Sequence, residues 1–132
     1  MKEILDTRFF TEHFYSGRVE TQQKTTRRLR ELVHRNEGIL PTIVISEVVQ
    51  VTCEKRGREL AEARYHALIE SGLQIETLTP TIARQAGIIK CQHKNIPMGD
   101  CIIAATAITN QARILTDDPH YKTIKETKST WI

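Results

Sequence analysis

Short apolar segments alternate with longer segments of helical pattern along the whole chain, and this alternation constrains the fold more than any other feature. Strands are predicted at residues 4–5, 39–40, 73–76, 112–116 and, at an edge, 129–132. Helices are predicted at residues 7–15, 20–35, 43–55, 58–70, 80–93 and 101–110, with a helical turn at 119–122. The alternation predicts an α/β sandwich, in which helices flank a central, mainly parallel sheet of four or five short strands in a three-layer arrangement.

Two of these helices differ from a standard amphipathic pattern. The segment from Ile43 to Val49 is rich in β-branched residues, as strands are, but we favour a helix because the segment continues to Glu54 after a cap at Thr42. Residues 101–110 are almost wholly small and apolar, which indicates a helix that is buried on most sides.

Composition describes one soluble domain. The 132 residues suffice for a single domain, residues 1–132, with a real core. The formal charge of +3 is compatible with a polyanionic partner but does not prove one. No apolar stretch approaches the roughly 20 residues that span a bilayer, and the N-terminus reaches Asp6 too early for a secretion signal, so a cytoplasmic protein is predicted.

The three cysteines have no zinc or redox spacing; we expect free thiols, with Cys101 buried on a helix.

Acidic residues beside apolar segments carry the main functional signal. The four aspartates, Asp6, Asp100, Asp117 and Asp118, each adjoin a segment that reads as a strand or buried helix, and Glu47 lies within an apolar run. Carboxylates are costly to bury unless they are paired or bind a cation. Convergence on one divalent metal site is an economical explanation, and it predicts a metal-dependent phosphodiesterase, most simply one that cuts RNA.

The predicted topology allows this convergence. Asp6 follows the first strand and Asp118 follows the fourth, and ligands of parallel sheets bind at the carboxyl ends of the strands. Glu47 lies on the helix after the second strand, and Asp100 opens the buried helix before the fourth strand. All of these carboxylates can therefore face the same end of the sheet.

Each of these residues also has an ordinary structural explanation, which for Glu47 is a solvated position on the helix surface. Asp6 and Asp100 could cap helices, and Asp117 with Asp118 could form a turn before a proline. Thr7 and Thr116 could orient a carboxylate or a metal-bound water, or serve as a helix cap and a strand residue.

His120 and the basic residues are weaker candidates. His120 could act on a leaving group, although a surface histidine is the more common case. Lysines and arginines between residues 24 and 94 could follow a phosphate backbone, but such runs are more often solvated helix faces.

The order and context of the acidic residues resemble those of the PIN-domain family over nearly the whole chain. The resemblance is carried by four segments: Leu5-Asp6-Thr7, Ile45-Ser46-Glu47-Val48, residues 98–107 and residues 115–121. It implies a ribonuclease dependent on Mg²⁺ or Mn²⁺ that leaves 5′-phosphate and 3′-hydroxyl ends. Many small members are VapC-type toxins, so the resemblance also implies an RNA substrate, an antitoxin partner and a homodimer, with no membrane association.

Position by position, the resemblance assigns roles to the acidic residues. Asp6, Glu47 and Asp100 match the acidic triad of the family. Asp118 best matches the fourth acid, and Asp117 falls at a more variable position, so both aspartates of the doublet stay in the expected metal-binding set.

Two other functions remain open at the level of sequence. One is a non-catalytic PIN-like module that binds RNA or protein, although such a surface has no need of converging negative charge. The other is a nuclease or phosphatase acting on DNA or small nucleotides, because the metal chemistry is the same and the surrounding surface decides the substrate.

Overall fold

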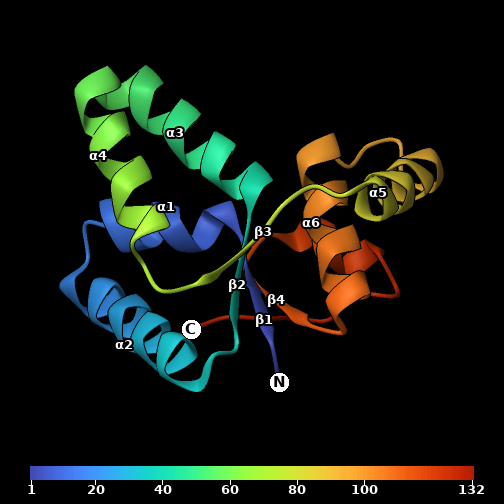
Figure 1. Ribbon diagram of the computed structural model, residues 1–132, viewed down its shortest axis with the longest axis horizontal. Helices are drawn as coiled ribbons and strands as arrows, with labels where there is room; N and C mark the ends of the chain where they lie inside the picture. The colour runs from blue at the N-terminus through green and yellow to red at the C-terminus, as the bar shows by residue number, and fades with distance from the viewer.

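A computed structural model describes all 132 residues (Figure 1). Its strands are β1 (Glu3–Leu5), β2 (Gly38–Pro41), β3 (Gln74–Glu76), β4 (Arg113–Leu115) and β5 (Ser129–Thr130). They form one sheet in the order β3-β2-β1-β4-β5, and every neighbouring pair is parallel. The predicted fold class, an α/β sandwich around a parallel sheet, is confirmed.

Helices cover both faces of the sheet. They are α1 (Thr7–Tyr15), α2 (Val19–Arg35), α3 (Thr42–Arg56), α4 (Arg58–Ile69), α5 (Pro80–Gln92), α6 (Met98–Asn110) and the 3₁₀ turn η1 (Pro119–Thr123). Figure 1 shows α1 to α4 on one side of the strands and α5 with α6 on the other. The helix prediction for residues 43–55 is therefore right, and α6 begins three residues before the predicted start, which places Asp100 inside its first turn.

Two predicted helix caps differ from the structure. Thr7 and Thr42 are the first residues of α1 and α3 rather than their caps, and neither preceding residue makes a side-chain cap hydrogen bond. Thr79 does cap α5, since its hydroxyl accepts a hydrogen bond from the backbone N–H of Ile82. The Thr7 hydroxyl is thereby free for a tertiary contact.

The core lies between the central strands and the helices on both faces. Ile4, Ile39 and Ile114 of the three central strands are each at most 1% exposed. On α6 the small residues from Ala104 to Ala107 are buried, so this helix packs closely against β1 and β4. Cys101 is buried on the same helix, as predicted, and all three cysteines are free thiols.

A charged residue is buried at the start of β1. Glu3 of β1 is 1% exposed, and its Oε2 accepts hydrogen bonds from Nε of Arg113 at 2.8 Å and from Nη2 at 2.5 Å. Arg28 on α2 approaches the same oxygen to 3.7 Å. The charged start of the first strand is thus held by an ion pair with the neighbouring strand.

The strand order fixes where a ligand site can lie. The chain builds β2 and β3 on one side of β1 and then β4 and β5 on the other. The order therefore reverses between β1 and β4, and parallel sheets bind ligands at the carboxyl ends of the strands at such a point. The residues that follow these two strands, Asp6 and Thr116, are both buried there. None of the helices combines the length and apolar character required to cross a bilayer.

Candidate metal centre

Four carboxylates from four different elements meet at the end of β1 and β4. Asp6 follows β1, Glu47 lies in the second turn of α3, Asp100 lies in the first turn of α6, and Asp118 precedes η1. The hydroxyl of Tyr121 on η1 lies 3.2 Å from Oδ1 of Asp6 and 3.4 Å from Oδ1 of Asp100, so it joins two of them. The structure therefore gathers four of the five acids that the sequence placed at this end of the sheet, and the ligand atoms of Asp100 and Asp118 lie nearest to one another, together with that of His120.

Asp6 is the most deeply buried member. Asp6 is only 3% exposed, and its Oδ2 accepts a 2.6 Å hydrogen bond from the hydroxyl of Thr116. Burial raises the pKa of Asp6 to about 6, and the charge of Asp100 adds to the shift, while the hydrogen bonds from Thr116 and Tyr121 oppose it. The ionised carboxylate is thus held in place but poorly solvated.

Glu47 reaches the centre from α3. Its Oε1 accepts a 2.6 Å hydrogen bond from the hydroxyl of Thr7, and a Cβ atom added at Gly99 would lie 2.6 Å from its Oε2. Glycine at position 99 is therefore what allows the carboxylate to lie against the start of α6. Burial raises the pKa of Glu47, and the charge of Asp100 raises it further.

Asp100 and Asp118 share a contact with His120. Nδ1 of His120 lies 2.9 Å from Oδ2 of Asp100 and 3.3 Å from Oδ1 of Asp118. Burial raises the pKa of Asp100, and the charge of Asp118 also raises it, while the hydrogen bond from His120 acts in the opposite direction. One potential ligand atom from each of these three residues lies within 4.8 Å of the other two.

Asp117 does not join this group. Its carboxylate accepts hydrogen bonds from Nε of Arg8 at 2.9 Å and from Nη2 at 3.1 Å, in a two-pronged ion pair. The Arg8 guanidinium lowers the pKa of Asp117. The structure therefore separates the doublet: Asp118 faces the centre, and Asp117 is neutralised at its edge.

Both threonines that the sequence offered as orienting groups hold a carboxylate. The Thr7 hydroxyl binds Glu47 and the Thr116 hydroxyl binds Asp6. Sequence reasoning assigned no role to Tyr121 or Arg8 and weighed His120 mainly as a surface residue. Arg8 lies 109 residues from Asp117 in sequence, so only the folded chain shows their contact.

The donor set fits a hard divalent cation. Mg²⁺ and Mn²⁺ prefer oxygen ligands, and all four convergent acids offer carboxylate oxygens. Burial is the main cause that raises the pKa values of Asp6, Glu47 and Asp100. The charge of Asp100 adds to the shifts of Asp6 and Glu47, and the charge of Asp118 adds to that of Asp100, so the ionised forms of these carboxyl groups are unfavourable together. A bound cation would relieve this repulsion.

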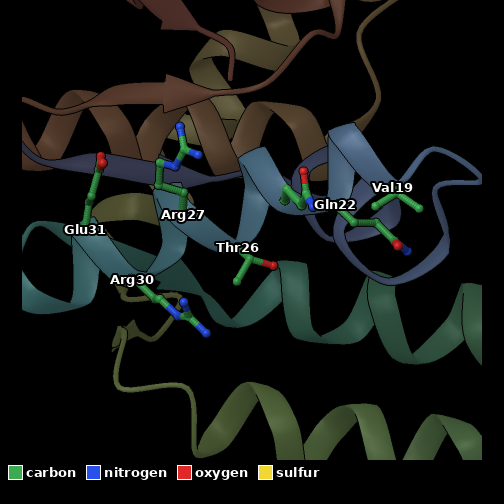
Figure 2. A pocket seen from close by; sticks show the side chains of 7 residues that line it. Val19, Gln22, Thr26, Arg27, Arg30 and Glu31 are labelled. Carbon is green, nitrogen blue, oxygen red and sulfur yellow. The ribbon is translucent and has the colours of Figure 1, made fainter.

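A pocket elsewhere on the surface is a poorer candidate. Figure 2 shows a pocket along α2, where Val19, Gln22 and Thr26 lie beside Arg27, Arg30 and Glu31. None of the four convergent carboxylates lines this pocket. The acidic centre is therefore the stronger candidate site.

Comparison with known proteins gives one family and a consistent set of folds. The family model described as PIN domain matches residues 4–126. VapBC2 from Rickettsia felis, bound to a DNA fragment from its promoter, superposes with a TM-score of 0.80 at 18% identity, covering 99% of this chain and 98% of that chain. VapC20 from Mycobacterium tuberculosis, a sarcin-ricin loop cleaving toxin, superposes with a TM-score of 0.74 at 15% identity, covering 93% of this chain and 95% of that chain.

A third structure is similar over the same extent. DNA-bound VapBC from Salmonella typhimurium superposes with a TM-score of 0.74 at 16% identity and covers 99% of this chain and 98% of that chain. No curated protein matches the sequence. At these sequence identities the solved structures establish only the fold, and the family model establishes which family the chain belongs to.

Proposed function

The chain belongs to the PIN domain family, and from this premise we propose that it is a divalent-metal-dependent endoribonuclease that hydrolyses RNA phosphodiester bonds. The observation that carries the proposal is the convergence of four carboxylates from four elements, three of them with raised pKa values. A surface that only bound RNA would gain nothing from concentrated negative charge, because the phosphate backbone is itself an anion.

Asp6, Glu47, Asp100 and Asp118 would hold the ion, Mg²⁺ or Mn²⁺. Such an ion supplies polarisation of a phosphoryl oxygen and acidification of the attacking water. The protein's own contribution is positioning. Thr116 fixes the Asp6 carboxylate, Thr7 fixes that of Glu47, and the buried Tyr121 hydroxyl spans Asp6 and Asp100.

Cleavage assays with defined metals test the function directly. The purified chain would be incubated with structured RNA, single-stranded RNA and single-stranded DNA, each with Mn²⁺, with Mg²⁺ and with EDTA. We expect RNA cutting that needs the metal and is absent from an Asp6→Asn/Asp100→Asn double variant, which controls for contaminating nuclease. Equal cutting by the double variant would refute the site.

The same panel discriminates the two alternatives. Preferential cleavage of DNA would indicate a different substrate for the same chemistry. Binding of RNA without turnover under any metal would favour a non-catalytic module, and it would leave the raised pKa values of the acids without a functional reason.

Gly99→Ala tests the position of Glu47 without touching a charged group. The new Cβ would lie 2.6 Å from Oε2 of Glu47, so the carboxylate must move away from the centre. We expect cleavage to fall about 10- to 100-fold, the range seen when groups that orient metal ligands are lost. Because alanine favours helices more than glycine does, the free energy of unfolding should stay equal or rise.

Gly87→Ala is the matched control. Gly87 lies within α5, and a Cβ there would meet no atom within 4 Å. We expect unfolding free energy to rise by roughly 0.5–1 kcal/mol with no change in cleavage. Similar kinetic losses in both variants would show that the position of Glu47 is not what Gly99 controls.

We further propose that the nuclease is the toxin of a toxin–antitoxin pair. VapC20, similar over almost its whole length, is described as a sarcin-ricin loop cleaving toxin, and the two VapBC structures are similar over a comparable extent. Induced expression should arrest bacterial growth, the Asp6→Asn/Asp100→Asn variant should not, and a neighbouring small open reading frame should relieve the arrest. Growth unaffected by the active chain would argue for another role.

The proposal also includes the oligomeric state and the location of the protein: we expect a homodimer in the cytoplasm. Large apolar side chains are exposed on three helices, at Val19 of α2, Ile69 of α4 and Ile88 of α5, and offer area for an antitoxin or a second subunit to bury. Light scattering on the purified chain distinguishes a dimer from a monomer, and fractionation of expressing cells tests the location.

A further inference from the structure

His120 lies against two of the acids that would hold the ion, and its role is not explained by the acidic centre alone. We propose that the His120 imidazole is itself a ligand of that ion, through Nδ1, and that the site therefore prefers Mn²⁺ to Mg²⁺. This inference rests on the proposed metal-dependent function. It adds a nitrogen to a set otherwise made of carboxylate oxygens.

Distances between the three side chains suit neighbouring ligands of one ion. Nδ1 of His120 lies 2.9 Å from Oδ2 of Asp100 and 3.3 Å from Oδ1 of Asp118. An ionised carboxylate only accepts hydrogen bonds, so Nδ1 carries the proton of its contact with Asp100. Binding of the ion at Nδ1 would replace that proton, which would pass to solvent from the imidazolium or move to Nε2 in the neutral ring.

The local backbone fixes the ring in this position. Asp118 precedes η1, and its Oδ1 accepts a 2.9 Å hydrogen bond from the backbone N–H of His120. The backbone N–H of Asp118 in turn donates to the hydroxyl of Thr116, and Tyr121, the next residue along, is 1% exposed. His120 therefore sits between two anchored residues, and little ordering would be required for it to bind an ion.

The surroundings of the ring leave few other structural roles. Nδ1 has no hydrogen-bond partner besides carboxylates of the centre. The side chain is 46% exposed, so it contributes little to the core. It makes no contact with another aromatic ring, whereas His13 stacks on Phe9.

A nitrogen ligand changes which ion the site selects. Mg²⁺ favours an all-oxygen shell, whereas first-row transition-metal ions also accept an imidazole nitrogen, and Mn²⁺ has the lowest affinity of that series for a given site. Asp6, Glu47, Asp100 and Asp118 alone would suit either Mg²⁺ or Mn²⁺. Adding His120 is expected to raise the affinity for Mn²⁺ relative to Mg²⁺.

Pulsed electron paramagnetic resonance on the Mn²⁺-loaded chain detects a coordinated nitrogen independently of activity. We expect coupling to ¹⁴N in the parent protein and its loss in His120→Asn and His120→Ala. Calorimetric titration should show that either variant weakens Mn²⁺ binding by about 10- to 100-fold, with a clearly smaller effect on Mg²⁺. Circular dichroism would verify that the variants are folded.

His93→Asn is the matched control, because His93 lines the same surface pocket as His120 and lies outside the acidic centre. It should retain both the ¹⁴N coupling and the Mn²⁺ affinity. Mn²⁺ bound without ¹⁴N coupling, or with coupling that survives in His120→Ala, would overturn this inference and leave the nuclease proposal standing. Failure of the parent chain to bind Mn²⁺ or Mg²⁺ would overturn both.

Discussion

Asp6→Asn is expected to abolish RNA cleavage and, at neutral pH, to make the metal-free protein more stable. Cleavage should fall at least about 100-fold, because the change removes a charge that holds the ion. Stability should rise because the wild-type carboxylate is 3% exposed and ionised beside Asp100. A catalytic residue whose removal stabilises the fold is the expected sign of a site built for an ion rather than for packing.

The pH dependence of this stability difference follows from the raised pKa of Asp6. Asp6 has a pKa of about 6 in the folded state against an ordinary value of 3.8, so the folded state binds this proton more tightly than the unfolded state does. The stability that Asp6 contributes is complete below about pH 4 and is lost as the pH rises through 6. At pH 7.5 the cost of ionised Asp6 in the metal-free protein is about 2–3 kcal/mol. Thermal melts in EDTA should therefore show Asp6→Asn above the parent at pH 7.5 and close to it at pH 4.

Metal binding should reverse the order of stability. A saturating cation stabilises the state that binds it, so Mg²⁺ at pH 7.5 should raise the melting temperature of the parent more than that of Asp6→Asn. If Mg²⁺ raised the melting temperatures of the parent and of Asp6→Asn equally, the ion would be bound at a site that does not include Asp6.

Asp117→Asn is the charge-matched control for this experiment. Asp117 pairs with Arg8 at the surface, and an exposed pair is worth about 0–1 kcal/mol. We expect Asp117→Asn to change stability slightly, to keep the response to Mg²⁺ and to cleave RNA, while Asp118→Asn loses cleavage. Loss of RNA cleavage in both Asp117→Asn and Asp118→Asn would mean that Asp117 also binds the metal.

Sequence patterns predicted the strands and helices well because each element has a local cause. Proline at the start of α5 and the small residues of α6 are signals that act over a few residues. The position of Asp6 and Asp118 followed from one topological rule, that parallel strands present their carboxyl ends at one edge. Local pattern and this rule therefore placed Asp6 and Asp118 at the same end of the sheet, where the structure also has them.

Contacts between distant residues could not be predicted in the same way. The doublet Asp117-Asp118 looks symmetrical in sequence, and only the approach of Arg8 from α1 shows which carboxylate faces the centre. Tyr121 gave no signal of its own, because a tyrosine after a turn is as often a surface residue as a buried one. These assignments depend on tertiary packing, which one sequence does not encode in any short pattern.

Glu3 is the clearest case of tertiary context overriding local expectation, and it carries the second large effect. A glutamate at the start of a strand reads as solvated, yet Glu3 is buried and its Oε1 has no hydrogen-bond partner. Its compensation comes from Arg113 on β4, with Arg28 farther away at 3.7 Å. We expect Arg113→Met to lower the free energy of unfolding by about 3 kcal/mol, because it leaves a buried charge without its main partner.

Denaturant unfolding and thermal melts measure this loss, which corresponds to a decrease in melting temperature of roughly 10 °C. Arg58→Met provides the control for removing an arginine, since Arg58 and Glu62 form an exposed pair and its loss should cost under about 1 kcal/mol. The double variant Glu3→Met/Arg113→Met should recover most of the stability, because apolar groups can replace a buried ion pair at little cost. A double variant as unstable as Arg113→Met would mean that Arg113 acts through packing of its stem, not through the charge of Glu3.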